Sequence, residues 1–256
     1  MRQLIPALVL SLWALTTSLA TALEIENRVQ FGPADADRTL RILSTGDAEL
    51  FAPMIESFLD TAPGLAVDYV VASSAEVMRA LQAEAEPFDL AISSAMDLQT
   101  RLVNDGLARP HRSQATAALP DWARWRDHLF AFTEEPAAII LSRAAFAGAP
   151  IPRTRQDLIE ALRARPERFR GRVGTYDVRV SGLGYLFATQ DARSSETFWR
   201  LSEVLGGLDV QLYCCSGQMI DDVVSGKLAV AYNVLGSYAR ARRDRDAFAL
   251  VLPEDY

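Results

Sequence analysis

The sequence predicts an α/β protein built of two lobes, and three observations carry this prediction. Short apolar runs that end in small hydroxyl residues recur along the chain, and each is followed by residues with helical spacing. These units fall into two sets, and the apolar, extended segment 129–142 separates them without a good helix. Strands alternating with helices are typical of parallel sheets joined by crossover helices, so we expect mostly parallel sheets with helices on both faces.

The first 22 residues have the composition of a secretory signal peptide. Arg2 precedes an apolar stretch over residues 4–20, which is short for a membrane span, and Ala20 to Ala22 give an A-x-A pattern. We expect cleavage after Ala22 and a mature protein in the periplasm, the alternative being an uncleaved anchor helix.

The first lobe is assigned to residues 23–135 and contains three strand–turn–helix units, over residues 39–58, 66–85 and 88–106. Gly106 should end the third helix. The first helix is expected to pack through one apolar face. That face contains Leu50, Phe51, Met54, Ile55 and Phe58.

The second lobe is assigned to residues 136–248. An amphipathic helix, stopped by Pro166, opens it, and three further units follow over residues 171–190, 209–226 and 227–244. Residues 249–256 are expected to begin a return crossover to the first lobe.

Hydroxyl side chains mark the turns where predicted strands give way to helices. Ser is a favoured N-cap residue, so a single turn of this kind is simply a capped helix. In an open sheet, however, such turns gather at the carboxyl ends of the strands, where ligands bind. Helix N-termini with hydroxyl donors form a cradle for an oxyanion. The turns contain Ser44 and Thr45, Ser73 and Ser74, Ser93 and Ser94, Ser181 and Gly182, Ser216 and Gly217, and Ser237.

Composition and motifs argue against several classes of function. The net charge is −7 and no basic run could follow a nucleic acid backbone. The chain has no nucleophile elbow, no P-loop, no full dinucleotide-binding fingerprint and no metal-ligand spacing. We therefore expect no catalysis, no cofactor and no bound metal, and keep an exported enzyme on the same scaffold as an alternative.

The two cysteines, Cys214 and Cys215, are adjacent. A disulfide between neighbours requires a strained ring, so both are expected to be reduced and partly buried. A redox or soft-metal role is the alternative.

From about residue 39 onward the chain resembles the periplasmic solute-binding proteins of ABC transporters, in particular their type II, ferric-ion-binding-like branch. The residues that carry the resemblance are "LRILSTGDAELFAPMIESF", "FDLAISSAMDLQTRLVNDGLARP", "GTYDVRVSGLGYLF" and "SGKLAVAYNVLGSYA". The resemblance implies a type II two-lobe fold that closes on one small solute and docks on a membrane permease. Family members continue beyond the segment like "FALVLPEDY", so the chain is expected to be C-terminally truncated.

One departure from the family concerns its ligand. Ferric-binding members use a consecutive tyrosine pair, which is absent here, since Tyr232 and Tyr238 are separated. The turns instead favour a phosphorylated, phosphonate or carboxylate solute, with Arg179 as its charged partner. Ferric-iron transport, and a ligand-sensing accessory of a two-component histidine kinase, are the alternative functions. The expected contacts are Ser44, Thr45, Gly46, Ser74, Ser93, Ser94, Tyr176, Arg179, Ser181, Gly182, Tyr232 and Asn233.

Overall fold

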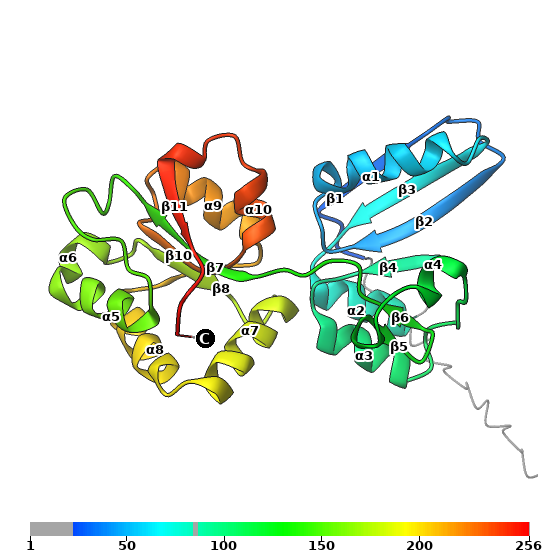
Figure 1. Ribbon diagram of the computed structural model, residues 1–256. Helices are drawn as coiled ribbons and strands as arrows, with labels where there is room; N and C mark the ends of the chain where they lie inside the picture. Colours follow the sequence, from blue (N-terminus) through cyan, green and yellow to red (C-terminus); the bar gives the residue numbers. More distant parts are fainter. Residues whose placement is uncertain (1–22, 84–86, 256) are drawn as a thin grey trace, which may run out of the picture.

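The computed structural model describes residues 23–83 and 87–255 (Figure 1). The predicted signal peptide and its cleavage site therefore lie outside the described residues. Within these ranges, no helix combines the length and apolar character needed to cross a bilayer. The described chain folds into two α/β lobes that lie side by side (Figure 1).

The first lobe is built on a four-stranded sheet with the strand order β1-β3-β2-β4. Strand β2 runs parallel to both β3 and β4, whereas β1 is antiparallel to β3. The elements are β1 (Asn27–Phe31), β2 (Arg38–Ser44), α1 (Ala48–Asp60), β3 (Leu65–Val71), α2 (Ser74–Ala83), β4 (Leu90–Ile92) and α3 (Met96–Asn104).

Helices cover both faces of this sheet. Side chains alternate between the two faces along each strand, so apolar residues of one strand pack on both. Val67 and Tyr69 of β3 pack with Ile55 of α1 on one face. Val70 packs with Val77 of α2 on the other face. The alternation explains why β3 reads as a continuous apolar run in the sequence.

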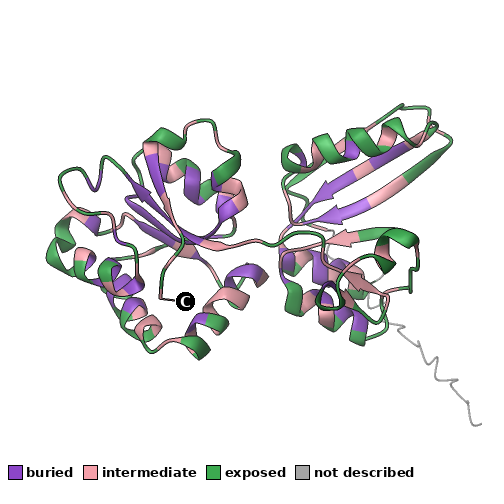
Figure 2. Ribbon diagram, in the orientation of Figure 1, coloured by how far each residue is buried: buried purple, intermediate pink, exposed green. Residues whose placement is uncertain are grey.

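Helix α1 packs through only part of the predicted face: Ile55 is buried and Phe51 packs against the core, as expected. Ala48 and Ile55 are its buried residues, whereas Leu50, Met54 and Phe58 are 39%, 50% and 46% exposed. Figure 2 shows the outer side of this helix as largely exposed. The prediction was wrong for these three residues, because α1 is apolar on more than one side and spacing alone does not say which side meets the sheet.

A short region leads from the first lobe to the second. It contains α4 (Gln114–Ala117), a 3₁₀ turn (Asp121–Ala123) and the hairpin of β5 (Arg124–Trp125) with β6 (Leu129–Phe130). Residues 131–136 then cross to the second lobe without regular structure (Figure 1). The segment 129–142, extended as expected from the sequence, is thus divided into β6 and β7, and Pro136 ahead of β7 offers no amide proton for a sheet ladder.

The second lobe has a five-stranded sheet with the order β11-β7-β10-β8-β9. Strands β8, β9 and β10 pair in parallel, whereas β7 is antiparallel to β10 and to β11. Residues 249–251, predicted to begin a return crossover, lie in edge strand β11. The elements are β7 (Ala137–Ser142), α5 (Arg155–Ala164), α6 (Pro166–Phe169), β8 (Val173–Tyr176), α7 (Gly182–Ser194), α8 (Thr197–Gly207), β9 (Gln211–Tyr213), α9 (Ser216–Val224), β10 (Val230–Leu235), α10 (Gly236–Ala241), the 3₁₀ turn Arg245–Ala247 and β11 (Phe248–Val251).

Helices cover both faces of the second sheet as well. Ile139 and Leu141 of β7 pack with Leu158 of α5 and Leu201 of α8. Ile140, which points to the opposite face, packs with α9 and α10. Strands with helices on both faces confirm the predicted α/β fold class.

Candidate ligand-binding cleft

The two lobes enclose a small cavity, which we call the inner cavity. Its volume is about 60 Å³, and residues of both lobes line it. Its wall is formed mainly by hydroxyl and small apolar side chains, with two carboxylates and both cysteines. The lining residues are Glu26, Thr45, Asp47, Ala72, Ser73, Ser74, Ser94, Tyr176, Val180, Ser181, Leu183, Cys214, Cys215, Ser216, Leu235 and Tyr238.

The hydroxyl groups reach this cavity because helices from both lobes begin at it. Helix α2 starts at Ser74, and the Ser73 hydroxyl accepts a hydrogen bond from the Glu76 amide at 3.2 Å. Ser181 is the N-cap of α7, and its Oγ accepts from the Gly184 amide at 3.1 Å. Helix α9 starts at Ser216. Three helix N-termini, with their positive ends of the backbone dipole, therefore meet at one cavity.

Among the residues that the structure describes, two direct hydrogen bonds join the lobes beside the cavity. The Gly182 amide of α7 donates to Ser74 Oγ at 2.5 Å, and the Asp47 amide donates to the Tyr238 hydroxyl at 3.2 Å. The backbone approach at Gly182 is so close that a Cβ there would lie 2.7 Å from Leu98 Cδ1 and 2.9 Å from Ser74 Oγ. The structure is therefore a closed conformation, in which a side chain at position 182 would require Leu98 and Ser74 to shift.

A second hollow, which we call the outer cavity, lies next to the inner one and shares Val180 with it. Its volume is about 260 Å³, and its lining residues are Ala75, Asp97, Leu98, Val178, Arg179, Val180, Gly182 and Tyr185. Arg179 is held there by Asp177, with Nε–Oδ1 and Nη2–Oδ2 distances of 2.8 and 2.6 Å. This paired hydrogen bonding lowers the pKa of Asp177 to about 2, so the ion pair persists at neutral pH.

The predicted contact residues lie in the inner cavity, in the outer cavity or outside both. Five of them line the inner cavity: Thr45, Ser74, Ser94, Tyr176 and Ser181. Arg179 and Gly182 line the outer cavity.

Ser44, Gly46 and Ser93 line neither cavity. Ser44 is fully buried, where its Oγ accepts from the Tyr69 hydroxyl at 2.7 Å and the Gly46 amide at 3.0 Å. Ser93 Oγ accepts from the Ala95 amide at 3.1 Å, ahead of α3. These hydroxyls hold the turns in shape, which is the helix-capping reading of such residues.

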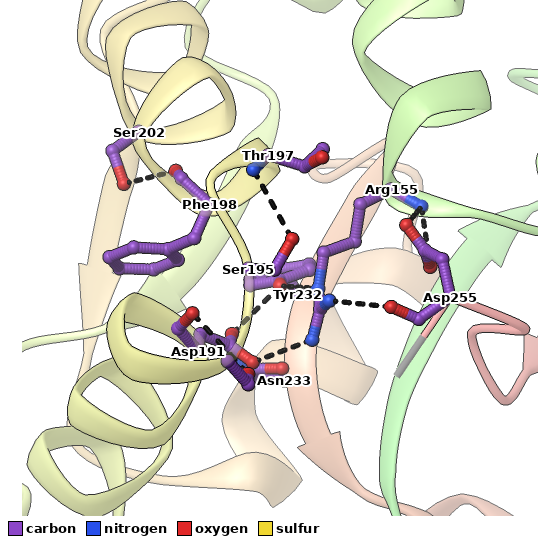
Figure 3. Close-up of polar contacts among 10 residues, drawn as sticks. Arg155, Asp191, Ser195, Thr197, Phe198, Ser202, Tyr232, Asn233 and Asp255 are labelled. Carbon is purple, nitrogen blue, oxygen red and sulfur yellow. Dashed lines mark hydrogen bonds and ion pairs between the residues drawn. The ribbon is translucent and has the colours of Figure 1, made fainter.

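Tyr232 and Asn233 also lie away from both cavities, in the interior of the second lobe (Figure 3). The two oxygens of the buried Asp191 carboxylate accept from Arg155 Nη2 at 2.7 Å, the Tyr232 hydroxyl at 2.8 Å and Asn233 Nδ2 at 2.8 Å. The ladder of β10 with β7 shifts between Ala231 and Val234, and Asn233 has a φ of +63°. This β-bulge sets the direction of both side chains, and the sequence gives no signal for it.

Sequence reasoning missed two acidic residues of the cleft, Glu26 and Asp47. Desolvation between the lobes raises the pKa of Glu26, and the nearby Asp47 and Glu24 carboxylates add to this effect. Desolvation likewise raises the pKa of Asp47, with contributions from Glu49 and Asp221. Asp47 directly follows the predicted turn and could have been found from this position. Glu26 lies in an N-terminal segment without any motif.

Two tyrosines of the inner cavity are hydrogen-bonded phenols. The Tyr176 hydroxyl bonds to Ser216 Oγ, and burial raises its pKa. Burial also raises the pKa of Tyr238 to about 12. Both side chains are therefore neutral at physiological pH and offer hydroxyl groups to a ligand.

Cys214 and Cys215 form a disulfide between adjacent residues, with the two Cα atoms 3.8 Å apart. The expectation that both are reduced was wrong. The pair lies between the end of β9 at Tyr213 and the start of α9 at Ser216. Cys214 is exposed and Cys215 half-buried, and both line the inner cavity.

Comparison with known proteins identifies relatives among solved structures. No protein-family model matches the chain, and no curated protein does. The substrate-binding protein of an ABC transporter from Agrobacterium tumefaciens is 34% identical, with a TM-score of 0.85 over 90% of this chain and 70% of that chain.

Two more distant structures share the fold. A ferric-binding protein from Campylobacter jejuni is 19% identical over 84% of this chain and 70% of its own, with a TM-score of 0.63. The periplasmic binding protein AfuA from Actinobacillus pleuropneumoniae has exogenous fructose-6-phosphate bound. It is 14% identical over 86% of this chain and 70% of its own, with a TM-score of 0.66. The fold, the cavity between the lobes and the level of identity to the Agrobacterium protein together establish that this chain belongs to the periplasmic substrate-binding proteins of ABC transporters.

Proposed function

We propose that this protein captures a small anionic solute between its lobes in the periplasm and delivers it to an ABC permease of the inner membrane, without chemical change. The observation that carries the proposal is the convergence of helix starts and hydroxyl groups of both lobes on the inner cavity. A solute that touches both lobes stabilises the closed form, and a permease can distinguish that form from the open one.

The chemistry of the cleft supports a solute with an oxyanion at one end. The starts of α2, α7 and α9, where the positive ends of the helix dipoles lie, and the hydroxyl groups of Ser74 and Ser181 suit a phosphate ester, a phosphonate or a carboxylate. Arg179 adds a cationic group in the outer cavity. The sugar phosphate bound by AfuA, a protein of the same fold, belongs to this class of solutes.

Glu26 and Asp47 favour a second feature of the solute. No lysine or arginine is among the residues that line the inner cavity, whereas these two carboxylates are. Hydroxyl or ammonium groups on the solute would pair with them, and a purely anionic solute would be repelled. We therefore favour a polyhydroxylated or zwitterionic solute that also carries the oxyanion.

Ferric-iron binding has less support. The two tyrosines of the inner cavity are neutral hydrogen-bonding phenols, and Tyr232 is engaged by Arg155 and Asp191 inside the second lobe. The comparison with the ferric-binding protein supports only a shared fold, because the two sequences are 19% identical.

The thermal stability of the oxidised protein tests the proposal. The panel comprises sugar phosphates, aminophosphonates, carboxylates, simple ammonium compounds and ferric citrate. A true solute at a hundred times its Kd adds about 2.7 kcal/mol to the free energy of unfolding, which gives a readily measured rise in Tm. A response to ferric citrate alone, or to none of the organic anions, would contradict the proposal. Isothermal titration of the solute that responds then gives the stoichiometry, expected to be one per chain.

A further inference from the structure

Three metal-ligating side chains from the two lobes meet at the edge of the inner cavity. A carboxylate oxygen of Glu26 and the sulfur atoms of Cys214 and Cys215 all lie within 4.8 Å of one another. Glu26 belongs to the first lobe, where its amide donates to the Val71 carbonyl at 2.9 Å, next to β1. The cysteines belong to the second lobe, at the start of α9.

In the oxidised state the two sulfurs are bonded to each other and are poor metal ligands. Reduction releases two adjacent thiols that face the same carboxylate. We propose that reduction of the Cys214–Cys215 disulfide converts this edge of the cleft into a site for a thiophilic divalent cation such as Zn²⁺, held by both thiolates and by Glu26.

A dithiol serves as the reductant in this step. The reductant transfers two electrons to the Cys214–Cys215 bond, which breaks to two thiols, and becomes a disulfide itself. The cation then displaces one proton from each thiol and forms two metal–sulfur bonds. The Glu26 carboxylate supplies an oxygen, and the fourth position stays open to water or to a solute.

The surroundings favour a cation over an anion at this edge. Asp47 lines the cavity beside Glu26, and no basic residue is among the lining residues. Cys215 is the N-cap residue of α9, and a helix N-terminus stabilises the thiolate form of a cysteine. Two sulfur ligands and one oxygen select zinc-like or softer metals over Mg²⁺ and Ca²⁺, which prefer oxygen ligands throughout.

The site would join the lobes by a reversible link that depends on redox state. It does not rest on the proposed function, since solute binding concerns the oxidised form and cation binding the reduced form. The two proposals can therefore fail separately.

Cadmium titration tests the site, because Cd²⁺ replaces Zn²⁺ on thiolates and gives an ultraviolet charge-transfer band. The protein is reduced with a phosphine, freed of reductant without air and titrated with CdCl₂, and native mass spectrometry counts the bound ions. We expect one Cd²⁺ per reduced chain, with the thiolate band, and no band in the oxidised chain. Absence of the band from the reduced protein would overturn the proposal.

Three variants test the ligand set, after circular dichroism has shown that each is folded. Cys214→Ser and Cys215→Ser should each weaken the band and the affinity. Glu26→Gln should weaken Cd²⁺ binding by about tenfold or more, since even loss of an outer partner of a metal ligand costs about 10- to 100-fold. Glu56→Gln, the matched control, removes an exposed carboxylate of α1 outside the cavity lining and should leave the affinity unchanged. If Glu26→Gln and the wild type bind Cd²⁺ with equal affinity, the proposal that the ion links the two lobes is overturned.

Discussion

Asp191 illustrates how a single buried charge organises the second lobe. Its carboxylate is 1% exposed and pairs with Arg155, whose side chain is fully buried. The same group accepts from Tyr232 and Asn233, so it ties α7 to α5 and to β10 (Figure 3). A buried pair is weak evidence for added stability, but removing one partner leaves an uncompensated charge in the interior.

We predict that Asp191→Ala destabilises the protein by about 3–5 kcal/mol, because Arg155 would keep its charge without its main counterion. Urea unfolding, followed by circular dichroism, measures the change. Asp121→Ala is the control, since Asp121 pairs with Arg124 at 2.6 Å while its side chain is 98% exposed. A surface pair of this kind is worth less than about 1 kcal/mol. Similar losses in both variants would contradict the interpretation.

Asp47 allows a prediction about pH. Its pKa is raised above the ordinary value of 3.8, so the folded protein favours the protonated carboxyl more than the unfolded chain does. This contribution to stability is complete below pH 3.8 and is lost as the pH rises through the raised pKa. Asp47→Asn keeps the amide that bonds to Tyr238, and loses no cap, since the Asp47 side chain makes no cap hydrogen bond to α1.

We therefore expect Asp47→Asn to gain Tm relative to wild type as the pH rises towards neutrality, with the gain vanishing in acid. Thermal unfolding of both proteins over a pH series measures the difference, in which the other titrating groups cancel. Glu56→Gln, on the exposed side of α1, controls for the loss of a negative charge elsewhere. A difference that stays constant with pH would show that the desolvated Asp47 carboxylate, repelled by Glu49 and Asp221, is not the cause.

At the scale of secondary-structure elements, α7 is the part of the second lobe that meets the first lobe most closely. Its first residue, Gly182, lies against Ser74 of α2 and Leu98 of α3. The N-cap Ser181 fixes where α7 begins, and thus where this contact falls.

We predict that Gly182→Ala opens the cleft without harming either lobe. The new Cβ would lie 2.7 Å from Leu98 Cδ1 and 3.1 Å from Ala95 Cβ, a clash that exists only when the lobes are closed. Small-angle X-ray scattering should report a larger radius of gyration, and solute affinity should fall. Gly206→Ala in α8, where a Cβ meets nothing within 4 Å, should keep the wild-type scattering profile and gain slightly in stability. An unchanged profile for Gly182→Ala would contradict the closed contact.

The sequence predicts where helices and strands lie along the chain better than it predicts which of their side chains are buried or reach the cleft. The strand–turn–helix units place α2, α3, α7 and α9 correctly, because apolar periodicity and hydroxyl caps are local signals. Which side of α1 is buried depends on the sheet beneath it, and Leu50, Met54 and Phe58 were misassigned for this reason. Tyr232 and Asn233 were expected at the cleft, but a bulge in β10 arises from pairing with β7 and has no local signature. The place of Glu26 beside the disulfide depends on contacts between distant parts of the chain, whereas the disulfide itself joins adjacent residues.

For the whole molecule, the balance between open and closed forms decides how a solute enters. The inner cavity of about 60 Å³ holds only a few water molecules, so the closed form must open before a solute can bind. Opening breaks the two hydrogen bonds that join the lobes, Gly182 to Ser74 and Asp47 to Tyr238.

We predict that Tyr238→Phe shifts the unliganded protein towards the open form. A hydrogen bond contributes about 0.5–1.5 kcal/mol, so the ratio of open to closed molecules should rise by about 2- to 13-fold. Fluorescence energy transfer between one dye on each lobe measures the ratio. Tyr185→Phe, which removes an exposed hydroxyl from α7, is the control and should leave it unchanged. A ratio equal to wild type in Tyr238→Phe would mean that this contact contributes nothing to closure.

Within residues 23–83 and 87–255, the backbone passes from one sheet to the other only once, through 131–136. A single covalent tether constrains distance but sets no axis of rotation, so the halves are free to swivel as well as to bend apart. The angular alignment of the two binding surfaces must then come from noncovalent contacts, among them the packing of Gly182 against Ser74 and Leu98 and the Asp47–Tyr238 hydrogen bond. These contacts, rather than the stiffness of the tether, therefore decide whether the hydroxyl groups of the two lobes face each other when the lobes close.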